Sequence, residues 1–164
     1  YSDGFNIDFI VYPLAESPEL PQLAQAIAGY WEQIGITTRL IPTDWGNARS
    51  QVLGRKYTNN ARTHSGAARP FVGPLFRIIY GTDGKLTTCS YPELDSHIEK
   101  ALAAKNLEEY TEHIGKAIAY IHDHYVEIPV VRYGTIYKTA EAITEWEFPR
   151  IGYDFGIEYL FTRR

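Results

Sequence analysis

Residues 5–45 constrain the fold of this chain more than any other segment. Apolar residues recur with a period of two over residues 5–11, at steps of three and four over residues 20–34, and with a period of two again over residues 36–41. These periods are typical of a β-strand, an amphipathic helix and a second strand. A strand-helix-strand segment of this length usually joins two parallel strands by a right-handed crossover. The sequence therefore predicts an α/β fold.

Turn and capping residues delimit the predicted helix. Ser17 is suited to cap its free N–H groups, and Pro18 suits the first helical position because proline has no N–H to satisfy. Gly35 follows the last apolar residue, where a left-handed residue is favoured. The predicted apolar stripe consists of Leu20, Leu23, Ala24, Ile27, Tyr30, Trp31 and Ile34.

The rest of the chain continues with helices and short strands. We predict a helix over residues 47–57, capped by Asp44 and packed through Val52 and Leu53, then a strand over residues 60–64 and a short helix over residues 74–80. Two glycines and two prolines break both periods over residues 65–74, which indicates a loop. Two amphipathic helices follow, with stripes at Leu94, Ile98, Ala101 and Leu102 and at Tyr110, Ile114, Ala117, Ile118 and Ile121. Residues 128–131 are then expected to form a short buried strand.

Composition excludes several classes of protein. The chain has 164 residues, of which 45% are hydrophobic, enough for one sizeable core. Its net charge of −4 argues against a general nucleic-acid surface. No apolar run approaches the roughly 20 residues needed to span a bilayer. Cys89 is the single cysteine, so no internal disulfide can form.

Several stretches resemble the extracellular solute-binding proteins of the peptide/nickel ABC-importer family (family 5). "YSDGF" precedes the first strand, and "PELPQLAQAIAGYWEQIGITTRLIPTDW" has the helix, strand and acidic-Trp pair of that family, here Asp44 and Trp45. From Cys89, "CSYPELDSHIEKALAAKNLEEYTEHIGKAIAYIHDHYVEIPVVRYGTIYKT" is similar to its later helices and proline-containing strand. Residues 143–146 match a further step, with Glu145 where glycine is frequent. The resemblance covers nearly the whole chain except residues 58–85.

The resemblance implies a periplasmic-binding-protein-like lobe (type II), in which helices flank a mixed sheet. Residues 1–155 would form one ligand-binding lobe of a larger two-lobed protein, and residues 156–164 an exit segment toward the missing lobe. The implied function is that of the substrate-binding component of an ABC transporter, which captures an oligopeptide or similar small solute between two lobes. Such a protein is expected to be a periplasmic or extracellular monomer. It would meet the membrane only through the importer's membrane subunits or a lipid anchor on the missing N-terminus.

Two other classes of function stay open. The same lobe would also suit a ligand sensor that feeds a receptor or kinase. A hydrolase has less support, because Ser65 lies outside a G-x-S-x-G elbow and Cys89 has no visible activating partner. We therefore expect no enzyme, no cofactor and no nucleic-acid partner.

The histidines do not have the spacing of a metal site. His113 and His124 share a helical face but lie about 16 Å apart along the axis, too far for one ion. No HExxH or CxxC motif is present. We interpret the five histidines as solvated residues, mostly on helices, and predict no metal. They are His64, His97, His113, His122 and His124.

What remains is a recognition surface around the predicted strand 60–64. Arg69 is suited to grip a carboxylate with its guanidinium fork. Candidate hydrogen-bonding residues are His64, Ser65 and Tyr80, and candidate apolar walls are Trp45 and Phe71. For Trp45, packing in the core beneath the helix is the competing interpretation. Many family members hold a peptide's amino end with an aspartate, but none occurs between Asn59 and Thr82, which argues against dipeptide specificity.

Overall fold

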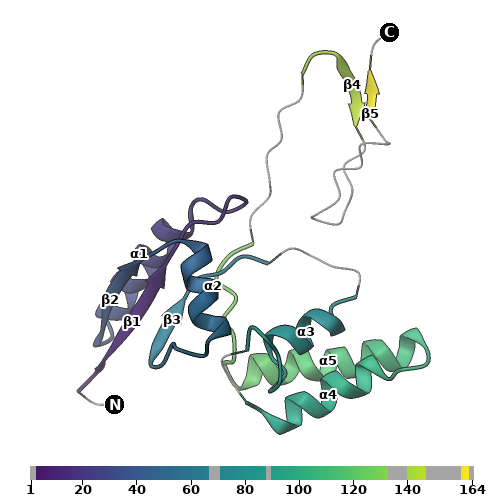
Figure 1. Ribbon diagram of the computed structural model, residues 1–164, viewed down its shortest axis with the longest axis horizontal. Coiled ribbons are helices and arrows are strands. Elements are labelled where there is room, and N and C mark those ends of the chain that lie inside the picture. The colour runs from purple at the N-terminus through teal and green to yellow at the C-terminus, as the bar shows by residue number, and fades with distance from the viewer. Residues whose placement is uncertain (1–2, 67–70, 88–89, 133–139, 147–159, 163–164) are drawn as a thin grey trace. The chain divides into compact units, whose positions relative to one another are not determined.

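The computed structural model describes residues 3–66, 71–87, 90–132, 140–146 and 160–162 (Figure 1). The chain divides into two compact units. The first unit comprises residues 1–66 and 75–96, and the second comprises residues 67–74 and 97–164. Each unit is described below by itself. Among the described residues, no helix combines the length and apolar character needed to cross a bilayer.

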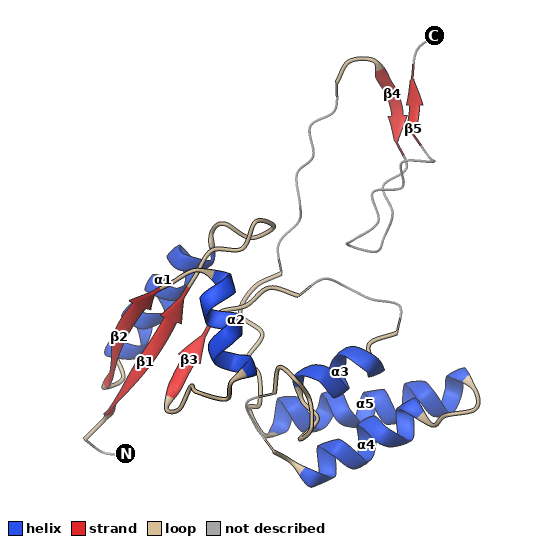
Figure 2. Cartoon of the chain, viewed as in Figure 1, coloured by secondary structure: helices blue, strands red, loops and turns tan. Residues whose placement is uncertain are grey.

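Helices and strands alternate along the first third of the chain, and helices dominate the middle (Figure 2). The strands are β1 (Phe5–Val11), β2 (Ile36–Pro42), β3 (Asn60–Arg62), β4 (Ile143–Trp146) and β5 (Leu160–Thr162). The helices are α1 (Leu20–Glu32), α2 (Trp45–Leu53), α3 (Gly73–Ile79), α4 (Pro92–Leu102) and α5 (Leu107–Asp123).

The predicted strand-helix-strand segment is confirmed. β1 pairs in parallel with β2 and with β3, which gives the strand order β2-β1-β3. β4 and β5 form a separate antiparallel pair. The α/β class is therefore confirmed. A mixed sheet combines parallel and antiparallel strand pairs. Among the described residues, the parallel pairs lie in the sheet β2-β1-β3 and the antiparallel pair lies in the separate sheet β4-β5.

β1 is buried on both faces at its carboxyl end. Phe9 and Val11 pack with α1, whereas Ile10 on the opposite face packs with Ala48 of α2. Because successive residues of a strand point to opposite faces, helices cover both sides of this end of the sheet. At the amino end of the strand Phe5 is 39% exposed, so the fully buried residues of β1 lie in its carboxyl half.

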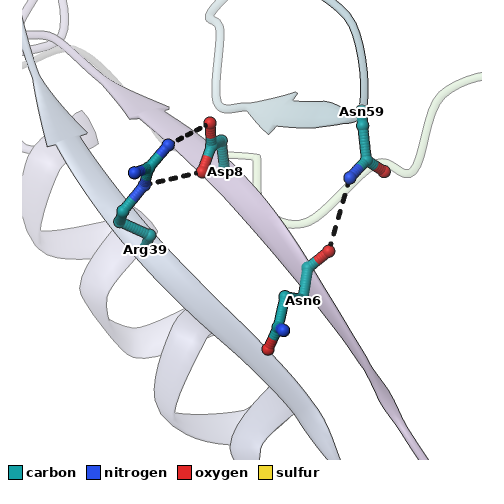
Figure 3. A network of polar contacts seen from close by, with 4 residues as sticks. All are labelled: Asn6, Asp8, Arg39 and Asn59. Atoms are coloured by element: carbon teal, nitrogen blue, oxygen red, sulfur yellow. Dashed lines mark hydrogen bonds and ion pairs between the residues drawn. The ribbon is translucent and has the colours of Figure 1, made fainter.

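The other end of β1 carries polar contacts instead (Figure 3). Arg39 of β2 donates two hydrogen bonds of 2.8 Å to the carboxylate of Asp8, its register partner in β1. This fork lowers the pKa of Asp8. The Asn59 amide, just before β3, donates to the backbone oxygen of Asn6 at 3.5 Å. These exposed contacts fix register and contribute little to stability, because water screens them.

α1 begins later than the sequence suggested. Its N-cap is Glu19, whose side chain makes no capping bond, and Pro21 rather than Pro18 occupies the first turn. The capping role predicted for Ser17 is therefore wrong; Ser17 is buried before the helix, where its backbone oxygen accepts from Leu20 N–H. The buried positions are Leu20, Ala24 and Ala28. Tyr30 and Ile34, predicted on the buried stripe, are 70% and 72% exposed. Gly35 has the predicted positive φ, +85°.

α2 has the predicted cap but a shorter length. Asp44 Oδ1 accepts a hydrogen bond of 2.9 Å from Asn47 N–H, so the capping prediction is confirmed. The helix ends at Leu53 instead of residue 57. Val52 is buried as predicted, together with Ala48, whereas Leu53 is 44% exposed.

The two later helices follow their predicted stripes, with two exceptions. α4 buries Leu94, Ile98 and Ala101, and α5 buries Ile114, Ala117 and Ile121. Leu102 and Ile118 are 36% and 51% exposed and lie outside the buried stripes. The predicted strand at residues 128–131 is wrong: this segment has no strand, and Ile128, Val130 and Val131 are exposed.

Candidate functional site

Three aromatic rings meet at the carboxyl ends of the strands in the first unit. Tyr12 follows β1, Trp45 opens the helix after β2, and His64 lies two residues beyond β3. The ring centroids are 5.3 Å apart for Tyr12 and Trp45, 5.1 Å for Trp45 and His64, and 6.4 Å for Tyr12 and His64. We call these residues the aromatic cluster. Carboxyl ends of parallel strands are where α/β proteins usually bind ligands.

Local structure holds the three residues in place. The Asp44 cap starts α2 at Trp45, and the half-buried indole packs against a core that includes Ile10 and Leu20. This burial agrees with the core interpretation of Trp45. Tyr12 is only 1% exposed, so its ring forms the floor of the cluster. His64 is the exposed member.

The Tyr12 hydroxyl determines which nitrogen of His64 carries the proton. It lies 3.3 Å from His64 Nδ1. Burial raises the pKa of Tyr12 to about 12, so the hydroxyl keeps its proton and, being buried, requires an acceptor. Nδ1 is the acceptor that the described residues offer, so the proton of neutral His64 resides on Nε2. The cluster therefore presents an N–H donor beside an aromatic surface.

The imidazole is held in its neutral form. The pKa of His64 is lowered, first by burial of the ring against its neighbours and then by the nearby positive charge of Arg62. The negative charge of Glu16 opposes this shift. Although the residue as a whole is exposed, the packed face of the ring loses hydration, which penalises the imidazolium. At neutral pH the His64 ring is therefore uncharged and offers its Nε2–H group as a hydrogen-bond donor.

The other predicted site residues are distributed between the two units. Ser65 is half-buried next to His64. Tyr80 follows α3 and meets Phe76 edge to face at 5.3 Å, within the first unit. Phe71 belongs to the second unit, where it is 62% exposed and packs edge to face on Tyr110. Arg69 lies outside the described residues. The structure thus brings Trp45 and His64 together.

Sequence reasoning missed Tyr12, Arg62 and Glu16. Tyr12 had a usable signal: it directly follows a strand that was predicted to be parallel, just before Pro13. Residues in that position usually face ligands. Arg62 and Glu16 had no such signal, because their influence on His64 depends on distances that only the folded chain creates.

The histidines correct another expectation. His97 and His113 are half-buried, and the Nδ1 atom of each is buried without a hydrogen-bond partner, so they are not solvated as predicted. His122 and His124 are exposed, as expected. Within the described part of the chain, no group of three or more His, Cys, Asp or Glu side chains is placed to hold a metal ion. Nδ1 of His64 contacts the Tyr12 hydroxyl. Among the described residues, no hydrogen bond joins the His64 ring to Ser65.

Comparison with known proteins gives one sequence relative and several solved structures. No family model matches the chain. Heme-binding protein A of Haemophilus influenzae is 24% identical over 135 residues, which cover 79% of this chain and 25% of that protein. A dipeptide binding protein from Pseudoalteromonas sp. SM9913, solved in complex with Met-Leu, matches 74% of the chain with a TM-score of 0.63 at 17% identity. A nickel ABC transporter from Bacillus halodurans matches 74% with a TM-score of 0.63 at 19% identity.

The matched region is a limited part of each of these proteins. This chain spans about a quarter of the length of the curated relative and of both solved chains, 25% in each case. Fold similarity at identities below 20% extends to architecture, and the periplasmic-binding-protein-like class is thereby confirmed. These relatives are solute-binding proteins of the peptide/nickel ABC-importer family, as the sequence motifs predicted, and the chain has the fold of one segment of them.

Proposed function

We propose that this chain is part of the substrate-binding component of an ABC importer, and that it captures a small solute at the aromatic cluster. The observation that carries the proposal is the meeting of Tyr12, Trp45 and His64 at the carboxyl ends of parallel strands. A largely apolar surface with one oriented donor is typical of ligand sites. The work is non-covalent, so the chain is not an enzyme.

The cluster suits a solute that combines an apolar group with a hydrogen-bond acceptor. The exposed part of Trp45 offers a flat apolar surface, and His64 Nε2–H donates to a carbonyl or carboxylate oxygen. Peptides combine a backbone carbonyl in every residue with apolar side chains in many of them, which favours an oligopeptide. Further contacts remain predictions for four residues: Ser65, Arg69, Phe71 and Tyr80.

Residues 1–155 would act as one lobe of a two-lobed receptor. A solute held between two lobes stabilises their closed arrangement by its higher affinity for that state. Membrane subunits of an importer would then recognise the closed form. The proposal therefore includes a periplasmic or extracellular location, and it takes the protein to be a monomer. The relatives are described as binding heme or dipeptide or as a nickel transporter, so the solute class varies within this fold.

Native mass spectrometry tests this proposal. A longer protein that contains this chain and a second lobe is purified without denaturation, because one lobe alone is expected to lose its solute during purification, and any solute that accompanies the protein is released and identified. We expect peptides or one small organic solute with a carbonyl or carboxylate group. Titration of that solute should then give binding about three- to tenfold weaker for His64→Phe, which keeps a ring beside Trp45 but removes one hydrogen bond.

The control variant is His122→Phe, an exposed position on α5 that has no part in the proposed site. It should bind as the unchanged chain does. Equal binding by the His64→Phe and unchanged chains would refute the role of the cluster. Turnover of the bound solute that disappears in Ser65→Ala would instead establish a hydrolase.

A further inference from the structure

A pair of histidines in the second unit has buried ring nitrogens without partners. His97 lies in α4 and His113 in α5, and their ring centroids are 6.5 Å apart with the ring planes 26° from parallel. Nδ1 is buried in both rings and has no hydrogen-bond partner. Buried polar atoms are normally satisfied, so two identical exceptions in neighbouring side chains require an explanation.

The exposed histidines of the same helical region differ from this pair. His122 Nδ1 lies 2.9 Å from a carboxylate oxygen of Asp123, and His124 Nδ1 lies 3.0 Å from the backbone oxygen of Tyr120. Hydrogen bonds to Nδ1 are therefore available where the rings face solvent. The unsatisfied nitrogens occur where two imidazoles are brought together by separate helices.

We propose that His97 and His113 bind one first-row transition-metal ion between them, with Cu²⁺ bound most tightly of the divalent ions. Imidazole nitrogen is a common ligand for copper, nickel and zinc, and affinity in a given site peaks at copper. With metal–nitrogen bonds of about 2 Å, two imidazoles that bind an ion from opposite sides have centroids about 6 Å apart, and a smaller angle at the ion brings them closer. The separation of 6.5 Å is close to that value.

The pair leaves the remaining coordination positions of the ion to water. No third protein ligand joins it among the described residues. Nδ1 of each ring is buried although both residues are only half-buried, so access for an ion requires a rotation of the side chains, which α4 and α5 permit while they stay folded. Such a site is separate from the aromatic cluster, which lies in the first unit. Binding of a metal ion by the two histidines would link α4 to α5 and stabilise the folded chain.

Titration of the full chain with Cu²⁺ alone tests the inference, followed by electron paramagnetic resonance. The background is the double variant His122→Ala/His124→Ala, which removes the exposed histidines at the carboxyl end of α5. We expect one equivalent of Cu²⁺ whose spectrum shows two imidazole nitrogens. His97→Gln and His113→Gln should each weaken binding at least about tenfold and leave one imidazole nitrogen in the spectrum.

Two results would overturn the inference. One is no copper uptake by the background variant. The other is uptake with the same affinity and spectrum in His97→Gln and His113→Gln, which would locate the ion elsewhere. Because the nitrogen count on the background variant needs no further substitution, the test holds even if a glutamine variant fails to fold.

Discussion

At the scale of single residues, the hydroxyl of Tyr12 is the contact that organises the candidate site. Tyr12→Phe keeps the buried ring but removes the bond to His64 Nδ1. We expect the free energy of unfolding to fall by about 1 kcal/mol, the usual net worth of one hydrogen bond. We also expect His64 to populate both neutral tautomers, measured from its ¹⁵N chemical shifts.

Tyr30→Phe is the matched control for this change, because Tyr30 is 70% exposed on α1. It should alter neither the stability nor the tautomer of His64. If Tyr12→Phe left the ¹⁵N shifts of His64 unchanged, the hydroxyl would not determine the tautomer. The predicted donor at Nε2 would then lose its basis.

His64 also gives the chain a predictable response to acid. Its pKa is lowered in the folded chain, mainly by burial, relative to the ordinary value of 6.5. The unfolded chain therefore takes up the proton first, and stability falls as the pH drops below 6.5 toward the lower folded pKa. Thermal unfolding midpoints between pH 8 and pH 5 should show this loss, and His64→Phe should reduce it. A pH dependence that is identical in the two proteins would contradict the assignment.

At the scale of secondary-structure elements, capping differs between the two helices that flank the sheet. Asp44 caps α2 through Asn47 N–H, whereas the Glu19 side chain at the corresponding position of α1 makes no such bond. Asp44→Ala should lower the free energy of unfolding by about 1 kcal/mol. Glu19→Ala, the matched control, should have little effect in urea denaturation. Equal losses in the two variants would show that charge near the helix end, not the capping bond, is responsible.

A second element-scale contact explains the Pro-Glu-Leu-Asp start of α4. The Asp95 carboxylate accepts hydrogen bonds from Thr82 N–H at 2.8 Å and from the Thr82 hydroxyl at 2.5 Å, so it closes the turn before the helix. We expect Asp95→Ala to cost roughly 2 kcal/mol of stability, since both bonds go to a charged acceptor. Glu93→Ala, an exposed acidic residue in the same turn, is the control. A loss no larger than that of Glu93→Ala in urea denaturation would contradict this role.

The same elements show how far the sequence determined the fold. The spacing of apolar residues located α1, β2, α4 and α5. In each of them the spacing repeats over two or more helical turns, or over two or more residue pairs of the strand. It placed the start of α1 too early, since Ser17 is suited to capping but the buried turn at Leu14 and Ser17 competes for it. The apolar run at residues 128–131 also predicted a strand, which the structure does not have. A strand needs a neighbouring strand to bond its backbone N–H and C=O groups, and apolar composition does not show whether one is present.

For the candidate site, the sequence indicated which residues are suited to bind a ligand, but not which of them lie next to one another in the fold. Trp45 and His64 were named as candidates from a motif and from a strand end, and the fold brings them to 5.1 Å. Tyr12 was missed because its role depends on a long-range contact. Its hydroxyl bonds to Nδ1 of His64, which is 52 residues away in the sequence. Such contacts follow from strand order, which local patterns do not determine.

At the scale of the whole molecule, the proposed capture between two lobes predicts weak binding by one lobe alone. It spans about a quarter of each relative, and a solute enclosed by two lobes receives only part of its contacts from one of them. Halving a binding free energy of about −8 kcal/mol changes a micromolar Kd to one near millimolar. We therefore predict that this 164-residue chain binds the solute found by mass spectrometry far more weakly than a longer protein that contains it. Isothermal titration of both proteins measures the difference, with circular dichroism to show that each is folded. Equal dissociation constants would mean that the aromatic cluster and its surroundings form a complete site, and the two-lobed capture proposed above would be wrong.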